Sequence, residues 1–208
     1  MKLSEPATAI TDYLLAIELL VLGSLLAGSS SHMPVRLWAA SFLMMALAAV
    51  AGGTFHARRF VLDTSSLQAL WNTVRIGIVL SFGLLLAAGA MSAPGVLGST
   101  LLPAGVAAVF VSLRGSSMPS ERGWNRTIRT VAILLSTLPV LLLIQLLSSG
   151  SPAGTWLLAG SLVTSGAIAI QRSRIRIHRH FNHNDLFHVA MMAGYYFLYR
   201  GGLLLRDR

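Results

Sequence analysis

The sequence predicts an all-α protein, a polytopic bundle of seven transmembrane helices, and three observations lead to this fold class. Hydrophobic residues make up 54% of the 208 residues and charged residues only 11%, whereas soluble domains carry about 25% charged residues. The chain has no cysteine, which excludes a disulfide-stapled secreted scaffold. Apolar runs long enough to cross a hydrocarbon core of about 30 Å recur from end to end. A water-soluble enzyme is therefore excluded, and residues 1–208 are expected to form a single transmembrane domain.

Seven apolar segments are predicted to span the membrane, because only a helix pairs its own backbone polar groups in lipid. The first carries Asp12 and Glu18 within its apolar run, unlike a cleaved signal peptide, and is expected to be retained. From there to the last segment, the breaks alternate between turn sequences, such as Ala93-Pro94-Gly95, and clusters of arginine. The predicted spans are residues 9–28, 36–57, 66–91, 94–113, 128–149, 153–171 and 185–205.

Basic residues give the predicted orientation. Ten of the sixteen follow the second, fourth and sixth spans, whereas the loops on the opposite side contain only Arg36. By the positive-inside rule, the N-terminus is predicted to be cytoplasmic, in an integral membrane protein of a bacterial inner membrane. The net charge of +9 is then explained by topology, and no nucleic-acid partner is expected. The ten residues are Arg58, Arg59, Arg114, Arg122, Arg126, Arg129, Arg172, Arg174, Arg176 and Arg179.

Polar side chains inside the spans are the candidate functional residues, because ionisable groups are costly there. The topology brings the inner end of the second span, with His56, to the same depth as the first turns of the seventh span. There Asp185 and His188 share a helix face. Two imidazoles and one carboxylate leave a fourth position for water, as catalytic zinc requires. We therefore expect His56, Asp185 and His188 to bind zinc, with Asp185 or Asp12 as catalytic base.

Seven further residues are expected to surround this site at the cytoplasmic side. A glycine one turn before His56 would let another helix or a ligand approach closely, and the rest place polar groups at a similar depth. These residues are Gly52, Glu18, Trp71, Asn72, Arg75, His183 and Asn184.

Other interpretations of the same residues remain open. His56 and His188 also suit interfacial histidines bonded to backbone carbonyls. Asp185 lies three residues after Asn182, the spacing of a helix-capping pair. Glu18 and Arg75 are predicted to form an ion pair between the first and third spans.

At these residues the chain resembles the CREST superfamily, which contains alkaline ceramidases and progestin and adiponectin receptors. The resemblance rests on seven helices, on Gly-Gly-x-x-His at residues 52–56 and on His-Asn-Asp-Leu-Phe-His at residues 183–188. It is greatest to the bacterial branch. The chain departs from the pattern of the superfamily in three respects. Asn184 replaces a histidine, and Gly52 replaces a serine. The aspartate that follows the second helix in the superfamily has no secure counterpart, since Asp63 is the only acid near that position.

The resemblance implies a zinc-dependent intramembrane hydrolase of a lipid amide or ester, with a metal-activated water at the cytoplasmic side. The alternative is a non-catalytic membrane protein, either a receptor-like lipid binder or a small transporter. A third interpretation places b-haem between His56 and His188, since two facing imidazoles can ligate iron axially. In each case the expected partners are the lipid bilayer and a lipid substrate or ligand.

Overall fold

The computed structural model describes residues 5–92, 152–173 and 181–205, with scattered positions between 129 and 150 and between 175 and 178. These residues are mainly helical and form no β-strand beyond an isolated bridge between His178 and Phe181. Five helices have described bounds: α1 Pro6–Ser29, α2 Met33–Arg58, α3 Thr64–Met91, α6 Pro152–Ser173 and α7 His183–Gly202.

The predicted all-α class is confirmed, and these five helices coincide with five of the seven predicted spans to within three residues at each end. The predicted spans 94–113 and 128–149 lie outside the described residues, apart from scattered positions of the second. A side-chain cap defines the start of α3. The Asp63 carboxylate accepts from the Ser66 N–H at 2.7 Å at the N-cap of α3. Hydrogen bonds from the Ser65 hydroxyl and the Ser66 N–H lower the pKa of this exposed carboxyl.

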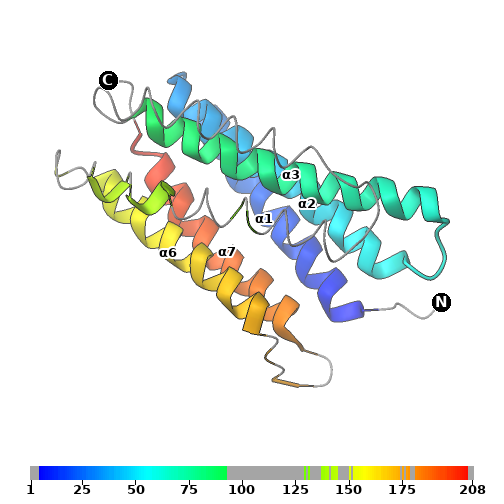
Figure 1. Cartoon of the computed structure of the whole chain (residues 1–208). Helices are drawn as coiled ribbons and strands as arrows, with labels where there is room; N and C mark the ends of the chain where they lie inside the picture. Colours follow the sequence, from blue (N-terminus) through cyan, green and yellow to red (C-terminus); the bar gives the residue numbers. More distant parts are fainter. Residues whose placement is uncertain are drawn as a thin grey trace.

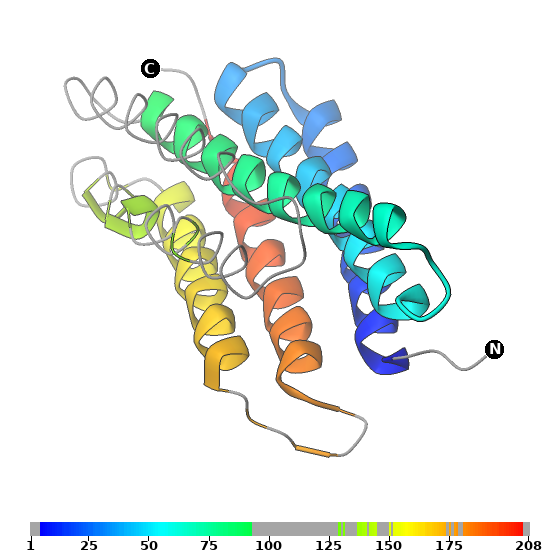
Figure 2. The same cartoon turned by 45° about the vertical axis from the view of Figure 1, so that its right-hand side comes forward.

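The helices alternate in direction, so that five helix ends meet at one end of the bundle (Figures 1 and 2). The N-terminal ends of α1, α3 and α7 lie there with the C-terminal ends of α2 and α6. Helix α2 packs between α1 and α3, α6 packs on α7, and α7 joins the two groups mainly through α1. We call this end the polar end, because it is where the candidate residues of α1, α2 and α7 come together.

Four of the described helices, α1, α2, α3 and α6, are long and apolar enough to cross a membrane. Their surface agrees with this. On α1, Ile10, Leu14, Ile17 and Val21 repeat at helical spacing and are exposed. An exposed apolar stripe of this kind suits lipid and not water. Helix α7 is not among the four, and its first two turns contain the polar residues His183, Asn184, Asp185 and His188.

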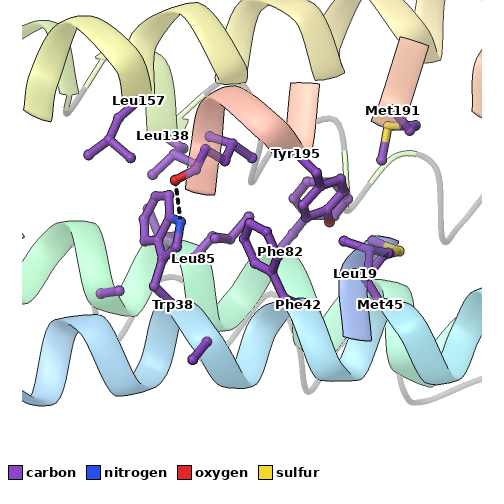
Figure 3. Close-up of a cluster of buried hydrophobic side chains, with 14 of the residues drawn as sticks. Leu19, Trp38, Phe42, Met45, Phe82, Leu85, Leu138, Leu157, Met191 and Tyr195 are labelled. Atoms are coloured by element: carbon purple, nitrogen blue, oxygen red, sulfur yellow. Dashed lines mark hydrogen bonds between the residues drawn. The ribbon is translucent and has the colours of Figure 1, made fainter. Parts of the chain in front are cut away.

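The core is formed by buried side chains of α1, α2, α3, α6 and α7 (Figure 3). Trp38 of α2 is fully buried, and its indole N–H donates to the Leu198 carbonyl of α7 at 3.0 Å. Phe42 meets Tyr195 edge to face, with ring centroids 4.9 Å apart. These contacts place α7 against α2 and thereby bring the first turns of α7 to the polar end.

Glycines let α6 and α7 approach closely. A Cβ atom at Gly160 would lie 2.8 Å from the Leu198 backbone nitrogen, and one at Gly194 would lie 2.5 Å from the Thr164 side chain. Membrane helices commonly associate through such small residues. The pair therefore forms a close-packed unit that carries the polar start of α7.

Candidate functional site

A cavity of about 320 Å³ lies between the helices and reaches the polar end. Its walls are mainly apolar, and its polar lining residues come from the ends of α1, α2, α6 and α7 that meet there. The apolar lining is Leu15, Met45, Ala48, Ala49, Gly52, Phe55, Val74, Ile78, Phe82, Val131, Ile168, Phe187 and Met191. The polar and indole lining is Asp12, His56, Trp71, Gln171, His183, Asn184 and His188.

A buried pair of side chains, Asp12 of α1 and His188 of α7, faces this cavity. His188 Nε2 lies 3.1 Å from Asp12 Oδ1, and Nδ1 lies 2.9 Å from the Thr11 hydroxyl. Because that hydroxyl donates to the Thr8 carbonyl at 3.1 Å, it accepts the Nδ1–H of His188. One further proton then lies between Nε2 and the Asp12 carboxyl. The arrangement is suited to acid–base chemistry or to polar recognition.

The second carboxylate oxygen of Asp12 is different from the first. Oδ2 is buried and has no hydrogen-bond partner among the described residues. It packs over Gly52 of α2, where a Cβ atom would lie 3.2 Å away. Gly52 therefore admits the Asp12 carboxyl of α1 at this point.

Asp185 is used as a structural group. Its Oδ1 accepts from the Thr8 hydroxyl at 2.8 Å, and its Oδ2 accepts from the Asn182 N–H at 2.6 Å. Asn182 in turn accepts from the Asn184 N–H, which completes a capping box at the start of α7. The capping interpretation of Asp185 is confirmed. The Asp185 side chain is fully buried, and its hydrogen bond from Thr8 also links the start of α7 to α1.

His56 lies at the rim of the polar end and is held by the N-terminus of α1. Its Nδ1 pairs with Glu5 Oε2, and the other oxygen of Glu5 lies 3.2 Å from Arg59. Because Glu5 is partly exposed, this pair is less shielded from the surroundings than Asp12 and His188.

The predicted zinc ligands do not form one metal-binding group. In the described part of the chain, no three His, Asp or Glu side chains are placed to hold a metal ion. Asp185 has both oxygens occupied, and His56 is paired with Glu5. Asp12, proposed as a base, is the carboxylate that faces His188. The set of His56, Asp185 and His188 thus does not fit zinc as it stands.

The residues expected around the site divide into two groups. Gly52, Trp71, His183 and Asn184 line the cavity, whereas Glu18, Asn72 and Arg75 are not among its lining residues.

The predicted ion pair between Glu18 and Arg75 is wrong. None of the ion pairs among the described residues joins them. Helix α2 separates the two helices that carry them, and no Cα atom of α1 comes within 8 Å of α3.

Sequence reasoning missed Glu5, Thr8 and Thr11, which hold the three candidate side chains in place. A signal for two of them exists, because Thr8, Thr11 and Asp12 follow at i, i+3 and i+4 and share one face of α1. Glu5 precedes the apolar run, and nothing in its neighbourhood marks it as the partner of a residue in α2.

Fold and site together define a helical protein with several helices of membrane-spanning length and a buried Asp–His pair at the polar end of an apolar cavity. The chain belongs to the family described as "Family of unknown function (DUF6962)", which it matches over residues 7–207. No curated protein and no solved structure matches it. The resemblance to the CREST superfamily therefore stays a prediction.

Proposed function

We propose that this protein is a seven-helix integral membrane protein of a bacterial inner membrane that binds a lipid in the cavity. The observation that carries the proposal is an apolar cavity of about 320 Å³ with a polar end, lined by helices of which four are of membrane-spanning length. This matches the two parts of a lipid, a chain and a headgroup.

The size and the surroundings of the cavity support a single-chain ligand. Ligand pockets range from about 300 to 1,000 Å³, so this one is at the small end. With the N-terminus in the cytoplasm, as the arginine-rich loops favour, the polar end lies at the cytoplasmic side of the membrane. A lipid of the inner leaflet would enter with its headgroup towards Asp12 and His188.

Filling the cavity should block lipid binding. Ala49 is buried and lines the cavity, whereas its neighbour Val50 is 40% exposed. We expect Ala49→Leu to raise the Kd of a fluorescent single-chain lipid at least about tenfold, the equivalent of 1.4 kcal/mol, and Val50→Leu to leave it unchanged. Fluorescence titration of the purified protein in detergent measures both. Unchanged binding in Ala49→Leu, with the protein folded, would place the ligand elsewhere.

Hydrolysis of a lipid amide or ester, with zinc as cofactor, is the second candidate function. The observation that favours it is the carboxyl of Asp12, a residue that lines the cavity beside His188, whose unpaired Oδ2 could accept a proton from an attacking water. The resemblance to the CREST superfamily points to the same reaction. We do not propose haem, because His56 Nδ1 is paired with Glu5 and no observation of this site favours haem.

The contacts of the site change the predicted zinc ligands in one respect, since Asp12 and not Asp185 is the carboxylate beside His188. If the protein binds zinc, His188→Ala and Asp12→Ala should lower its zinc content steeply. Asp185→Asn should keep the zinc, because Asp185 is a capping residue. Elemental analysis of protein purified with zinc present measures all three variants. If Asp185→Asn loses its zinc and Asp12→Ala keeps it, Asp185 is the carboxylate ligand, as predicted from the sequence.

A further inference from the structure

We propose that the lipid bound in this cavity has a headgroup with a hydrogen-bond donor, a hydroxyl or an N–H, which Asp12 Oδ2 accepts. The inference rests on the proposed lipid-binding function and adds the chemistry of the ligand to it.

The first step is the state of the oxygen itself. Asp12 is only 5% exposed, its carboxyl lines the cavity, and Oδ2 has no hydrogen-bond partner in the part of the chain that the structure describes. Buried polar atoms are nearly always paired, because an unpaired acceptor has lost its water without replacement. Because the Asp12 side chain lines the cavity, we infer that a group bound there pairs with this acceptor.

The described residues around Oδ2 supply no hydrogen-bond donor to it. The nearest position on α2 is Gly52, which has no side chain, and any Cβ there would crowd the carboxyl. The described lining residues include no lysine and no arginine. His183, at the start of α7, also lines the cavity, and its Nδ1 is a second buried atom without a described partner. Among the described lining residues, Asp12 Oδ2 and His183 Nδ1 are thus two buried polar atoms with which a group bound in the cavity can pair.

The role of Oδ2 does not depend on where the shared proton lies. If His188 Nε2 carries it, Asp12 is a carboxylate and both of its oxygens accept. If Asp12 Oδ1 carries it, Oδ2 is a carbonyl oxygen and accepts as well. His188 holds Oδ1 in either case, at 3.1 Å, so the carboxyl cannot turn without breaking that contact. Headgroups with a donor are thus favoured, and headgroups that only accept would meet Oδ2 with no hydrogen bond between them.

Four probes with similar chains test this: dodecanol against dodecyl methyl ether, and dodecanamide against methyl dodecanoate. Each pair differs in the headgroup donor and is measured by displacement of a fluorescent single-chain lipid from the purified protein. We expect each donor probe to bind at least about tenfold more tightly than its partner, because an unpaired buried group disfavours the analogue that lacks the donor. Comparing dodecanol with dodecanamide shows whether a hydroxyl or an N–H is preferred.

Asp12→Leu should abolish the preference. Leucine cannot accept a hydrogen bond, so position 12 then presents no acceptor to a ligand in the cavity. The alcohol and the ether should now bind about equally, and so should the amide and the ester. The matched control is Asp63→Leu, at an exposed cap of α3 outside the cavity, which should keep the wild-type preference.

The outcomes separate the two proposals. Equal binding within both pairs by the wild-type protein would overturn the donor proposal and leave lipid binding intact. Failure of all four probes to displace the lipid would overturn both. A folded Asp12→Leu variant that still prefers donors would also overturn the assignment to Oδ2. The wild-type ratios need no substitution, so they decide the question even if the variant does not fold.

Discussion

Replacing His188 by leucine is expected to destabilise the protein by about 3 kcal/mol or more, because it leaves the Asp12 carboxyl buried without its partner. Asp12 Oδ1 has His188 Nε2 at 3.1 Å, and no other contact of this atom takes its place among the described residues. Unfolding in detergent, followed by circular dichroism against denaturant, measures the change.

The double variant Asp12→Leu/His188→Leu should recover most of that loss, since exchanging a buried pair for apolar residues of similar volume is often close to neutral. His183→Leu is the control on the same helix, because Nδ1 of His183 has no described partner to lose. A His188→Leu variant within about 0.5 kcal/mol of the parent, a change typical of surface positions, would show that the pair contributes little to the fold.

Replacing Trp38 by alanine is expected to destabilise the protein by about 3–5 kcal/mol, the usual range for a large aromatic residue deleted from a core. The side chain is fully buried, it packs against Gly202, and its N–H reaches the Leu198 carbonyl of α7. The deletion removes this packing and leaves a cavity between α2 and α7.

Two matched substitutions separate packing from the hydrogen bond. Trp38→Phe keeps most of the ring volume and loses the N–H donor. We expect it to lower the free energy of unfolding by about 1 kcal/mol for the lost hydrogen bond, and by a further amount because the phenyl ring is smaller. Leu47→Ala removes an exposed apolar side chain of the same helix and should have a small effect. Thermal unfolding of all three variants in one detergent measures the order. A Trp38→Ala variant as stable as Leu47→Ala would contradict the packing shown in Figure 3.

The helices could be predicted well because their signals are local. The length of an apolar run, a capping acid such as Asp63 and a cap pair such as Asn182 and Asp185 lie within a few residues of the ends they define. The alternation of direction follows from short connections between successive spans. It correctly placed the ends of α1, α2 and α7 with the candidate residues together at one end.

The pairing of side chains at that end could not be predicted in the same way. Sequence spacing put Asp185 and His188 on one face of α7, but it could not show that Thr8 and the start of α7 would satisfy both oxygens of Asp185. The error over Glu18 and Arg75 has the same origin. Equal depth in two helices was taken for contact, whereas α2 separates them.

The sequence by itself determined that the protein is helical, that several of its helices can span a membrane, and which helix ends carry polar residues. Only the tertiary structure decided that Asp12 is the partner of His188, that Asp185 is a cap, and that an apolar cavity opens beside Asp12 Oδ2. The physical reason is range. Hydrophobicity and capping act between residues close in sequence, whereas a hydrogen bond of about 3 Å between two helices depends on how every intervening side chain packs. A glycine such as Gly52 has no side chain of its own to signal the contact, yet it lets the Asp12 carboxyl approach α2 there.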